Sequence, residues 1–334
     1  MQIEREQAFR RNERLEALLQ EMNEILEPAE DRILENHHMP RYPVIFIVGC
    51  ARAGSTLMMQ WLASTGIFAY PTNLLSRFYA APSIGARIQQ LLTDSTYRFR
   101  DEFDDCATAL QFSSDLGKTK GTLAPNEFWY FWRRFFHYGE IQQLDEDELA
   151  CVDGAKFLAE LAALEAVFDK PFVLKALIIN WNIPFIARII DKALFIHITR
   201  QPLHNAQSLL ESREKYFGTI DEWYSFKPPE FLKFKNCGPH AQVAGQVYFT
   251  NEAISKGLHQ VNSDRWMKVS YEEFCRNPAA VFSTIKEKFI KQDCLVDWNY
   301  NGPETFACKN QIRLSEAAVQ QIMDAYTTCA EGNR

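Results

Sequence analysis

A glycine-rich loop near residue 50 is the first segment whose residue types could bind a ligand. Gly49 and Gly54 enclose four residues between an apolar run and a helical pattern. In this setting backbone N–H groups and the positive end of a helix dipole can bind an anion. Ser55 and Thr56 follow Gly54 directly, where a nucleoside-triphosphatase loop has a lysine. Because Arg52 is the only cation of the loop, we expect an anion site built on side-chain cations; the alternative is a plain strand-to-helix turn.

A second polar group follows the apolar run of residues 193–199. Arg200 ends this run, Pro202 suits the first turn of a helix, and Ser208 comes about two turns later. An arginine that donates two hydrogen bonds and a serine hydroxyl can converge on one phosphate. A triphosphatase would need an acid on a neighbouring strand to hold Mg²⁺, whereas this run ends in arginine. The two segments together predict an anion site without a metal.

Alternating strands and helices must position these residues. Continuous apolar runs indicate buried parallel strands at 43–48, 172–177, 193–199 and 266–269. Helical patterns lie between and after them, at 57–63, 202–214 and 315–326. The fold class is therefore α/β, with a central parallel β-sheet flanked by helices.

The segment before the first predicted strand has the residue pattern of a helix and is expected to lie outside the main domain. Residues 2–26 have helical apolar spacing, and Pro28 is expected to end that helix, which packs on the body or on a second subunit. We expect residues 1–40 to form an N-terminal helical extension and residues 41–334 a single domain. Within that domain, residues 70–150 are less regular and are the expected acceptor-binding insertion.

The two polar motifs, in this order and at this separation, resemble those of the PAPS-dependent sulfotransferase family. PAPS is 3′-phosphoadenosine 5′-phosphosulfate. Arg52 to Thr56 is similar to the family's 5′-phosphosulfate loop, and Arg200, Pro202 and Ser208 are similar to its 3′-phosphate site. Three further segments resemble the family's lysine strand, its adenine-side tyrosine and its basic closing loop: residues 172–175 with Lys175, residues 269–271 with Tyr271, and residues 309–313 with Lys309 and Arg313. The likeness spans about residues 42–326 and implies a P-loop-like sulfotransferase fold.

The resemblance implies a role for each of these residues, with PAPS as the sulfuryl donor, PAP as the product and no metal. The 5′-phosphate would be held by Ala53, Gly54, Ser55, Thr56 and Leu57. The 3′-phosphate would be held by Arg200 and Ser208, with Lys309 and Arg313 closing over it and Tyr271 beside the adenine. Arg52 would lie at the bridging oxygen and Lys175 at the transferring group, where both stabilise charge.

The acceptor and its base are where the sequence departs from the family's cytosolic phenol and steroid branch. That branch has a histidine two residues after its lysine, whereas this chain has Leu177. Glu127 and His137 are our candidate bases, because carboxylates serve in the carbohydrate-modifying branches; each also has a structural alternative, as a helix-start acid or an ordinary histidine. The chain is thus closer to the bacterial and carbohydrate-type branches, with a carbohydrate or small-metabolite hydroxyl or amine as acceptor. The aromatic run 128–136 is either core or the wall of that acceptor pocket.

Composition limits the other functions. The 334 residues have a formal net charge of −7, which argues against nucleic acid as a partner. The apolar runs have strand length, and the charged N-terminus lacks a signal-peptide core, so we expect a cytoplasmic protein without a membrane span. The N-terminal helix is a candidate homodimer contact. Two rival functions are a nucleotide-dependent phosphotransferase with a divergent P-loop, and a non-catalytic relative of the fold.

Overall fold

A four-stranded parallel sheet forms the centre of the computed structural model, which describes residues 5–97, 103, 106 and 112–332. The strand order is β2-β1-β3-β4. The bounds are Val44–Val48 for β1, Val173–Lys175 for β2, Ala193–Thr199 for β3 and Trp266–Ser270 for β4. The predicted α/β class and all four strands are confirmed. β2 is shorter than its apolar run because Leu177–Ile179 form a 3₁₀ turn, η5.

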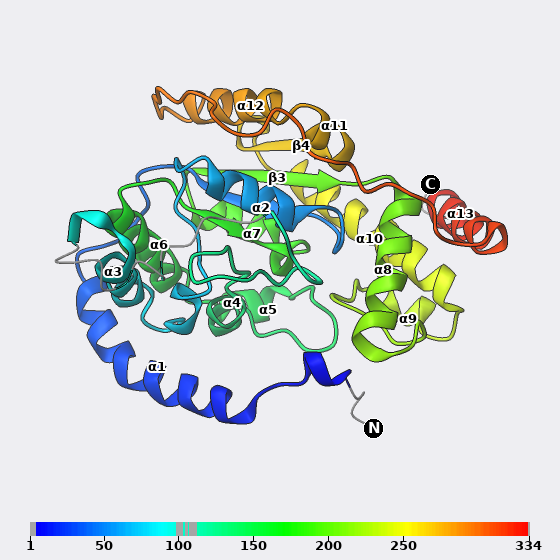
Figure 1. Ribbon diagram of the computed structural model, residues 1–334, viewed down its shortest axis with the longest axis horizontal. Helices are drawn as coiled ribbons and strands as arrows, with labels where there is room; N and C mark the ends of the chain where they lie inside the picture. Colours follow the sequence, from blue (N-terminus) through cyan, green and yellow to red (C-terminus); the bar gives the residue numbers. More distant parts are fainter. Residues whose placement is uncertain (1–4, 98–102, 104–105, 107–111, 333–334) are drawn as a thin grey trace.

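The two faces of the sheet pack against different helices. Alternate residues of β1 enter separate cores, with Phe46 on one side and Ile45 and Ile47 on the other, because successive side chains of a strand point to opposite faces. One core contains α4 (Trp129–Phe135), α6 (Gly154–Phe168) and α7 (Ile183–Ile189). The other contains α2 (Ser55–Ser64) and α12 (Pro278–Ile290). In Figure 1, α12 lies above the sheet and α4 below it.

A third group of helices lies beyond the carboxyl ends of the strands, as Figure 1 shows for β3. It consists of α8 (Pro202–Phe217), α10 (Pro239–Leu258) and α13 (Glu316–Glu331). Cys50, from the glycine-rich loop, is buried in this group. The loop is therefore fixed between the sheet and the third group of helices. The remaining helices are α3 (Pro82–Thr93), α5 (Glu146–Ala150), α9 (Phe231–Phe234) and α11 (Tyr271–Arg276), with 3₁₀ turns η1 (Gln7–Phe9), η2 (Leu75–Arg77), η3 (Ser95–Tyr97) and η6 (Ser263–Arg265).

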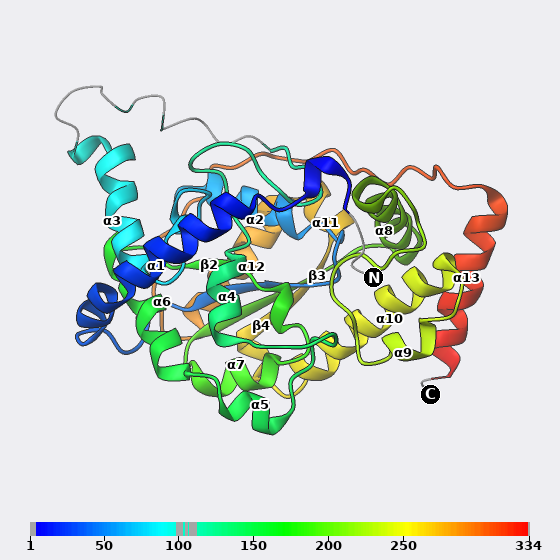
Figure 2. The ribbon, with the colours of Figure 1, turned by 90° about the horizontal axis from the view of Figure 1, so that it is seen from below.

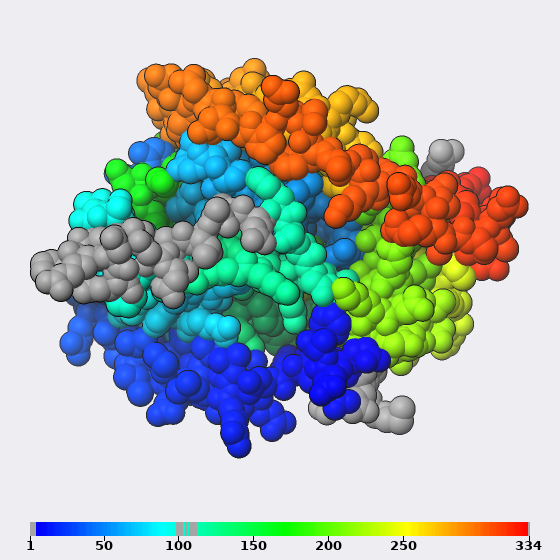
Figure 3. Space-filling view, in the orientation of Figure 1, coloured from blue at the N-terminus to red at the C-terminus, as the bar shows by residue number. Residues whose placement is uncertain are grey.

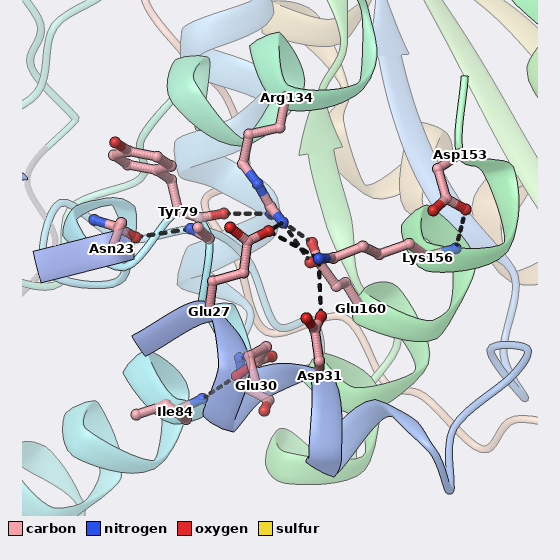
Figure 4. A network of polar contacts seen from close by, with 12 residues as sticks. Asn23, Glu27, Glu30, Asp31, Tyr79, Ile84, Arg134, Asp153, Lys156 and Glu160 are labelled. Atoms are coloured by element: carbon pink, nitrogen blue, oxygen red, sulfur yellow. Dashed lines mark hydrogen bonds and ion pairs between the residues drawn. The ribbon is translucent and has the colours of Figure 1, made fainter. Parts of the chain in front are cut away.

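The N-terminal helix α1 spans Glu13–Leu34 and contains Pro28, so the prediction that Pro28 ends the helix is wrong. Proline removes one helical hydrogen bond, but the residues after it are held by the body. Glu30 is fully buried and accepts hydrogen bonds from the first amides of α3, 2.8 Å from Ser83 N and 3.1 Å from Ile84 N. Figure 4 shows Glu30 and the neighbouring charged residues of α1 pointing toward α3, α4 and α6. Packing on the body is confirmed, and a role in a dimer stays a prediction.

The aromatic run 128–136 belongs mainly to the core. Phe131, Trp132, Phe135 and Phe136 are buried against the sheet and α6. Trp129 is half-buried and packs against the same core, so the role of this run as an acceptor wall stays a prediction. Within the described ranges, no helix combines the length and apolar character needed to cross a membrane.

Candidate functional site

The predicted ligand-binding residues meet at the carboxyl edge of the sheet. Lys175 is the last residue of β2 and pairs in register with Ile47 of β1. The glycine-rich loop follows β1, Arg200 follows β3, and Tyr271 follows β4. Because parallel strands end at one edge, residues that are far apart in the sequence share one site there.

The loop geometry requires both of its glycines. A Cβ on Gly49 would lie 2.5 Å from the carbonyl oxygen of Ile198, and one on Gly54 would lie 2.6 Å from the ring of Tyr271. Asn180 holds Gly49 through two hydrogen bonds, accepting from its N–H (3.2 Å) and donating to its carbonyl (2.9 Å). Gly54 caps α2 without a side chain, so the first amides of α2 have no capping acceptor. These amides and the helix dipole favour an anion at this point.

Arg52 connects the two predicted motifs. Its Nε donates to Ser208 Oγ across 3.2 Å, and its carbonyl oxygen accepts from Arg200 Nη1 across 3.2 Å. Arg52, Ser208 and Arg200 therefore surround one corner of the site. Within the part of the chain that the structure describes, neither arginine forms an ion pair with a carboxylate.

The C-terminal loop closes this corner over Arg200. Arg200 Nη2 donates to the Lys309 carbonyl (2.5 Å), and its Nε donates to Asn310 Oδ1 (2.9 Å). Its guanidinium carbon lies 4.8 Å from the ring centre of Tyr271, and burial lowers its pKa. The Tyr271 hydroxyl accepts from the Lys309 amide (3.2 Å), and burial raises the Tyr271 pKa to about 12. Arg313 is ion-paired with Glu211 at 2.7 Å, and both side chains stay exposed.

Lys175 and Glu127 form the second half of the site. The Lys175 side chain is only 8% exposed; its ammonium donates to Thr56 Oγ1 across 3.0 Å and is ion-paired with Glu127. Asn126 fixes the backbone next to Glu127, because its side chain accepts from the Phe128 amide at 2.8 Å. His137 lies exposed after α4, and its side chain has no recorded contact with Lys175 or Glu127 in the described residues. The structure thus brings Glu127 to Lys175 and leaves His137 outside this group.

Two features of the site were not predicted. Tyr224 donates a hydrogen bond to the Leu116 carbonyl (3.3 Å), and burial raises its pKa to about 12, with opposing contributions from the nearby charges of Arg52 and Glu127. Gly117, with φ +87°, lies against Glu127, Lys175 and Thr56. Among residues 115–118 the one glycine, Gly117, is a weak indication of a turn. No sequence pattern predicts that Tyr224 contacts this turn.

Comparison with known proteins gives one family. The family model described as "Sulfotransferase family" matches residues 43–289. No curated protein matches the sequence significantly. No group of three or more His, Cys, Asp or Glu side chains within the described ranges is arranged to hold a metal ion.

Several solved structures resemble the chain at low identity. The sulfotransferase domain from the curacin biosynthetic pathway is 14% identical, with a TM-score of 0.40, over 87% of this chain and 98% of that one. The sulfotransferase domain of the Synechococcus PCC 7002 olefin synthase is 17% identical, with a TM-score of 0.40, over 88% and 96%. A Mycobacterium tuberculosis H37Rv sulfotransferase is 12% identical, with a TM-score of 0.49, over 92% and 80%.

Proposed function

Because this chain belongs to the sulfotransferase family, we propose that it transfers a sulfuryl group from PAPS to a hydroxyl or amine of an acceptor, leaving PAP. The observation that carries the proposal is the corner formed by Arg52, Ser208 and Arg200. The side chains of both arginines reach this corner, and neither has a carboxylate partner in the described residues. Two cations without a carboxylate partner at one corner of the site favour an anion there, and the two phosphate groups of such a nucleotide suit that need.

The donor would be held by both motifs. We assign the 5′-phosphate to the amides of Ala53 to Leu57 with the hydroxyls of Ser55 and Thr56, and the 3′-phosphate to Arg200 and Ser208. Tyr271 would lie beside the adenine, and the loop with Lys309 and Arg313 would cover the 3′-phosphate. When bound, PAPS supplies a sulfuryl group attached to a phosphate that leaves readily.

Arg52, Lys175 and Glu127 would carry the reaction. Arg52 stabilises charge near the leaving phosphate, and its contribution is electrostatic because an arginine side chain is not a proton donor in catalysis at neutral pH. Lys175 contacts both Thr56 and Glu127, so it joins the donor loop to the candidate base. Glu127 accepts the acceptor proton; we favour it over His137 because of this contact.

The proposed class of acceptor is based on Glu127 and the aromatic residue near it in the sequence. A carboxylate base suits an alcohol of a carbohydrate or small metabolite. Trp129, which is half-buried beside Tyr138 and Phe226 and follows Glu127 by two residues, is our candidate for an aromatic wall against the acceptor ring.

Thermal unfolding with PAP, ATP plus Mg²⁺, and AMP tests the donor. A ligand at one hundred times its dissociation constant adds about 2.7 kcal/mol to the free energy of unfolding, so PAP should raise the midpoint by a few degrees. A shift with ATP and none with PAP would make the protein a phosphotransferase. No shift with any of the three would favour the non-catalytic relative.

A further inference from the structure

A two-residue hairpin turn lies against the catalytic side chains. Asp115 and Lys118 exchange two backbone hydrogen bonds, each 2.8 Å long. The residues between them, Leu116 and Gly117, both have positive φ, +48° and +87°. This is the backbone of a tight hairpin turn, which keeps its shape through its own hydrogen bonds.

The tip of this hairpin fills the corner that the reacting groups share. A methyl carbon on Gly117 would lie 3.2 Å from Glu127 Oε1, 3.4 Å from Lys175 Nζ and 3.5 Å from Thr56 Oγ1. A base must come within about 2.6–3.2 Å of the acceptor oxygen. An acceptor oxygen at the position of that methyl carbon would be near all three groups, but it would lie only one bond length from the Gly117 Cα and would collide with it. Glu127 stays 47% exposed on its other side, whereas Lys175 is 8% exposed. The hairpin therefore covers the place next to Lys175.

Three side-chain contacts hold the hairpin in this position. Tyr224 donates to the Leu116 carbonyl at 3.3 Å, and Lys215 of α8 is ion-paired with Asp115 at 2.5 Å. The Lys118 ammonium lies 5.5 Å from the ring centre of Phe9 in the N-terminal segment. In Figure 3 the blue-green chain that includes the hairpin lies at the surface beside the dark-blue N-terminal residues.

The arm that carries Tyr224 is itself fixed to α8 and α10. Gln246 donates to the carbonyl oxygens of Tyr224 (2.9 Å) and Phe226 (3.0 Å). Buried Arg213 donates to the Ile220 carbonyl (3.2 Å) and to Gln242 Oε1 (2.7 Å). Tyr224 is therefore a fixed point, and the hairpin is the part that can move away from it.

We propose that the hairpin 115–118 is a gate on the acceptor side, closed over Lys175 and latched by Tyr224 and by the Asp115–Lys215 ion pair. From the side that the hairpin covers, an acceptor reaches Lys175 only when the hairpin withdraws and both latches break. The gate proposal rests on the proposed function in one respect, the assignment of catalytic roles to Lys175 and Glu127.

The rate at which Lys175 is acetylated by sulfo-N-hydroxysuccinimide acetate, followed by mass spectrometry, measures how often the gate opens. Tyr224→Phe removes one hydrogen bond worth about 0.5–1.5 kcal/mol, so the rate should rise about 2- to 10-fold. Asp115→Ala removes an exposed ion pair worth up to about 1 kcal/mol and should raise it up to about 5-fold. The double variant should exceed either single variant.

Tyr70→Phe is the matched control. Tyr70 also donates to a backbone carbonyl, that of Leu123 at 3.2 Å, but outside the hairpin, so the Lys175 rate should stay at the wild-type value. Asp115 is on the surface, so its variant keeps the test valid even if Tyr224→Phe folds poorly. An unchanged Lys175 rate in the Asp115→Ala and double variants would overturn the gate. If Lys175 is labelled faster in the hairpin variants but the protein does not bind PAP, the proposed gate is supported and the proposed donor is wrong.

Discussion

Arg200 is the residue whose surroundings argue most directly for an anionic ligand. Within the described residues its side chain donates hydrogen bonds to neutral oxygens, namely the carbonyls of Arg52 and Lys309 and the side-chain amide of Asn310. Burial lowers its pKa, which means that the charged form is poorly solvated here. A phosphate would supply the missing negative charge in the two-bond geometry that a guanidinium prefers.

Arg200→Ala should therefore weaken PAP binding far more than AMP binding. Hydrogen bonds to charged groups contribute about 1.5–3 kcal/mol each, so the PAP dissociation constant should rise by about 10- to 100-fold. AMP lacks the 3′-phosphate and should lose little. Titration calorimetry with both nucleotides measures the difference, and exposed Arg276→Ala is the control arginine. An equal loss for PAP and AMP would mean that Arg200 only supports the fold.

The residues at strand ends could be predicted from sequence because the strands themselves are visible. The apolar runs before Gly49, Arg200 and Tyr271 end where the polar residues begin, and parallel strands place those ends together. Tyr224 could not be found in this way. Its position depends on Gln246 and on the hairpin, and such contacts between distant segments leave no local pattern.

At the scale of one element, β3 contains a histidine that should contribute to the loss of folding stability at acid pH. His197 is 1% exposed, pairs in register with Val48, and its Nε2 lies 3.0 Å from Asn251 Oδ1. Burial lowers the His197 pKa from 6.5 to about 4. Between these values the unfolded chain binds the proton and the folded protein does not, so stability falls as pH falls.

The stabilising contribution of neutral His197 is thus complete above pH 6.5 and is lost as the pH drops toward 4. The loss should amount to about 3 kcal/mol. His197→Gln keeps an amide donor for Asn251 and should show a smaller drop in urea stability between pH 7 and pH 4.5. The exposed His38→Gln variant should keep the wild-type slope. If the His197→Gln slope equals that of wild type, burial of this ring does not control the acid response.

Elements without an apolar run were less predictable than β3. The helix α1 continues past Pro28, because the contacts of Glu30 and its neighbours outweigh a local breaker signal. In the 115–118 turn the backbone of Leu116 has a positive φ, a conformation that residues other than glycine, asparagine and aspartate rarely adopt. Both exceptions come from tertiary contacts that override local preference.

At the scale of the whole molecule, α1 runs along the outside of the body across α3 and α6, as Figure 2 shows. Its charged side chains join several helices at once. Lys156 of α6 lies 2.8 Å from both Glu27 and Asp31, and Arg134 of α4 lies 2.9 Å from Glu160 and 3.1 Å from Glu27. The division of the chain at residue 40 stays a prediction, but these contacts favour α1 as a structural part of the domain.

Glu30→Ala tests how much α1 contributes to the stability of the whole chain. The substitution removes the acceptor of the buried Ser83 amide and of the partly buried Ile84 amide at the start of α3. An unsatisfied buried group costs about 1–3 kcal/mol, so the free energy of unfolding in urea should fall by about 2–4 kcal/mol in one cooperative transition. Exposed Glu21→Ala on the same helix should change it by less than about 0.5 kcal/mol. If Glu30→Ala instead gave a separate early transition, α1 would unfold alone, and the helical extension 1–40 would be the better description.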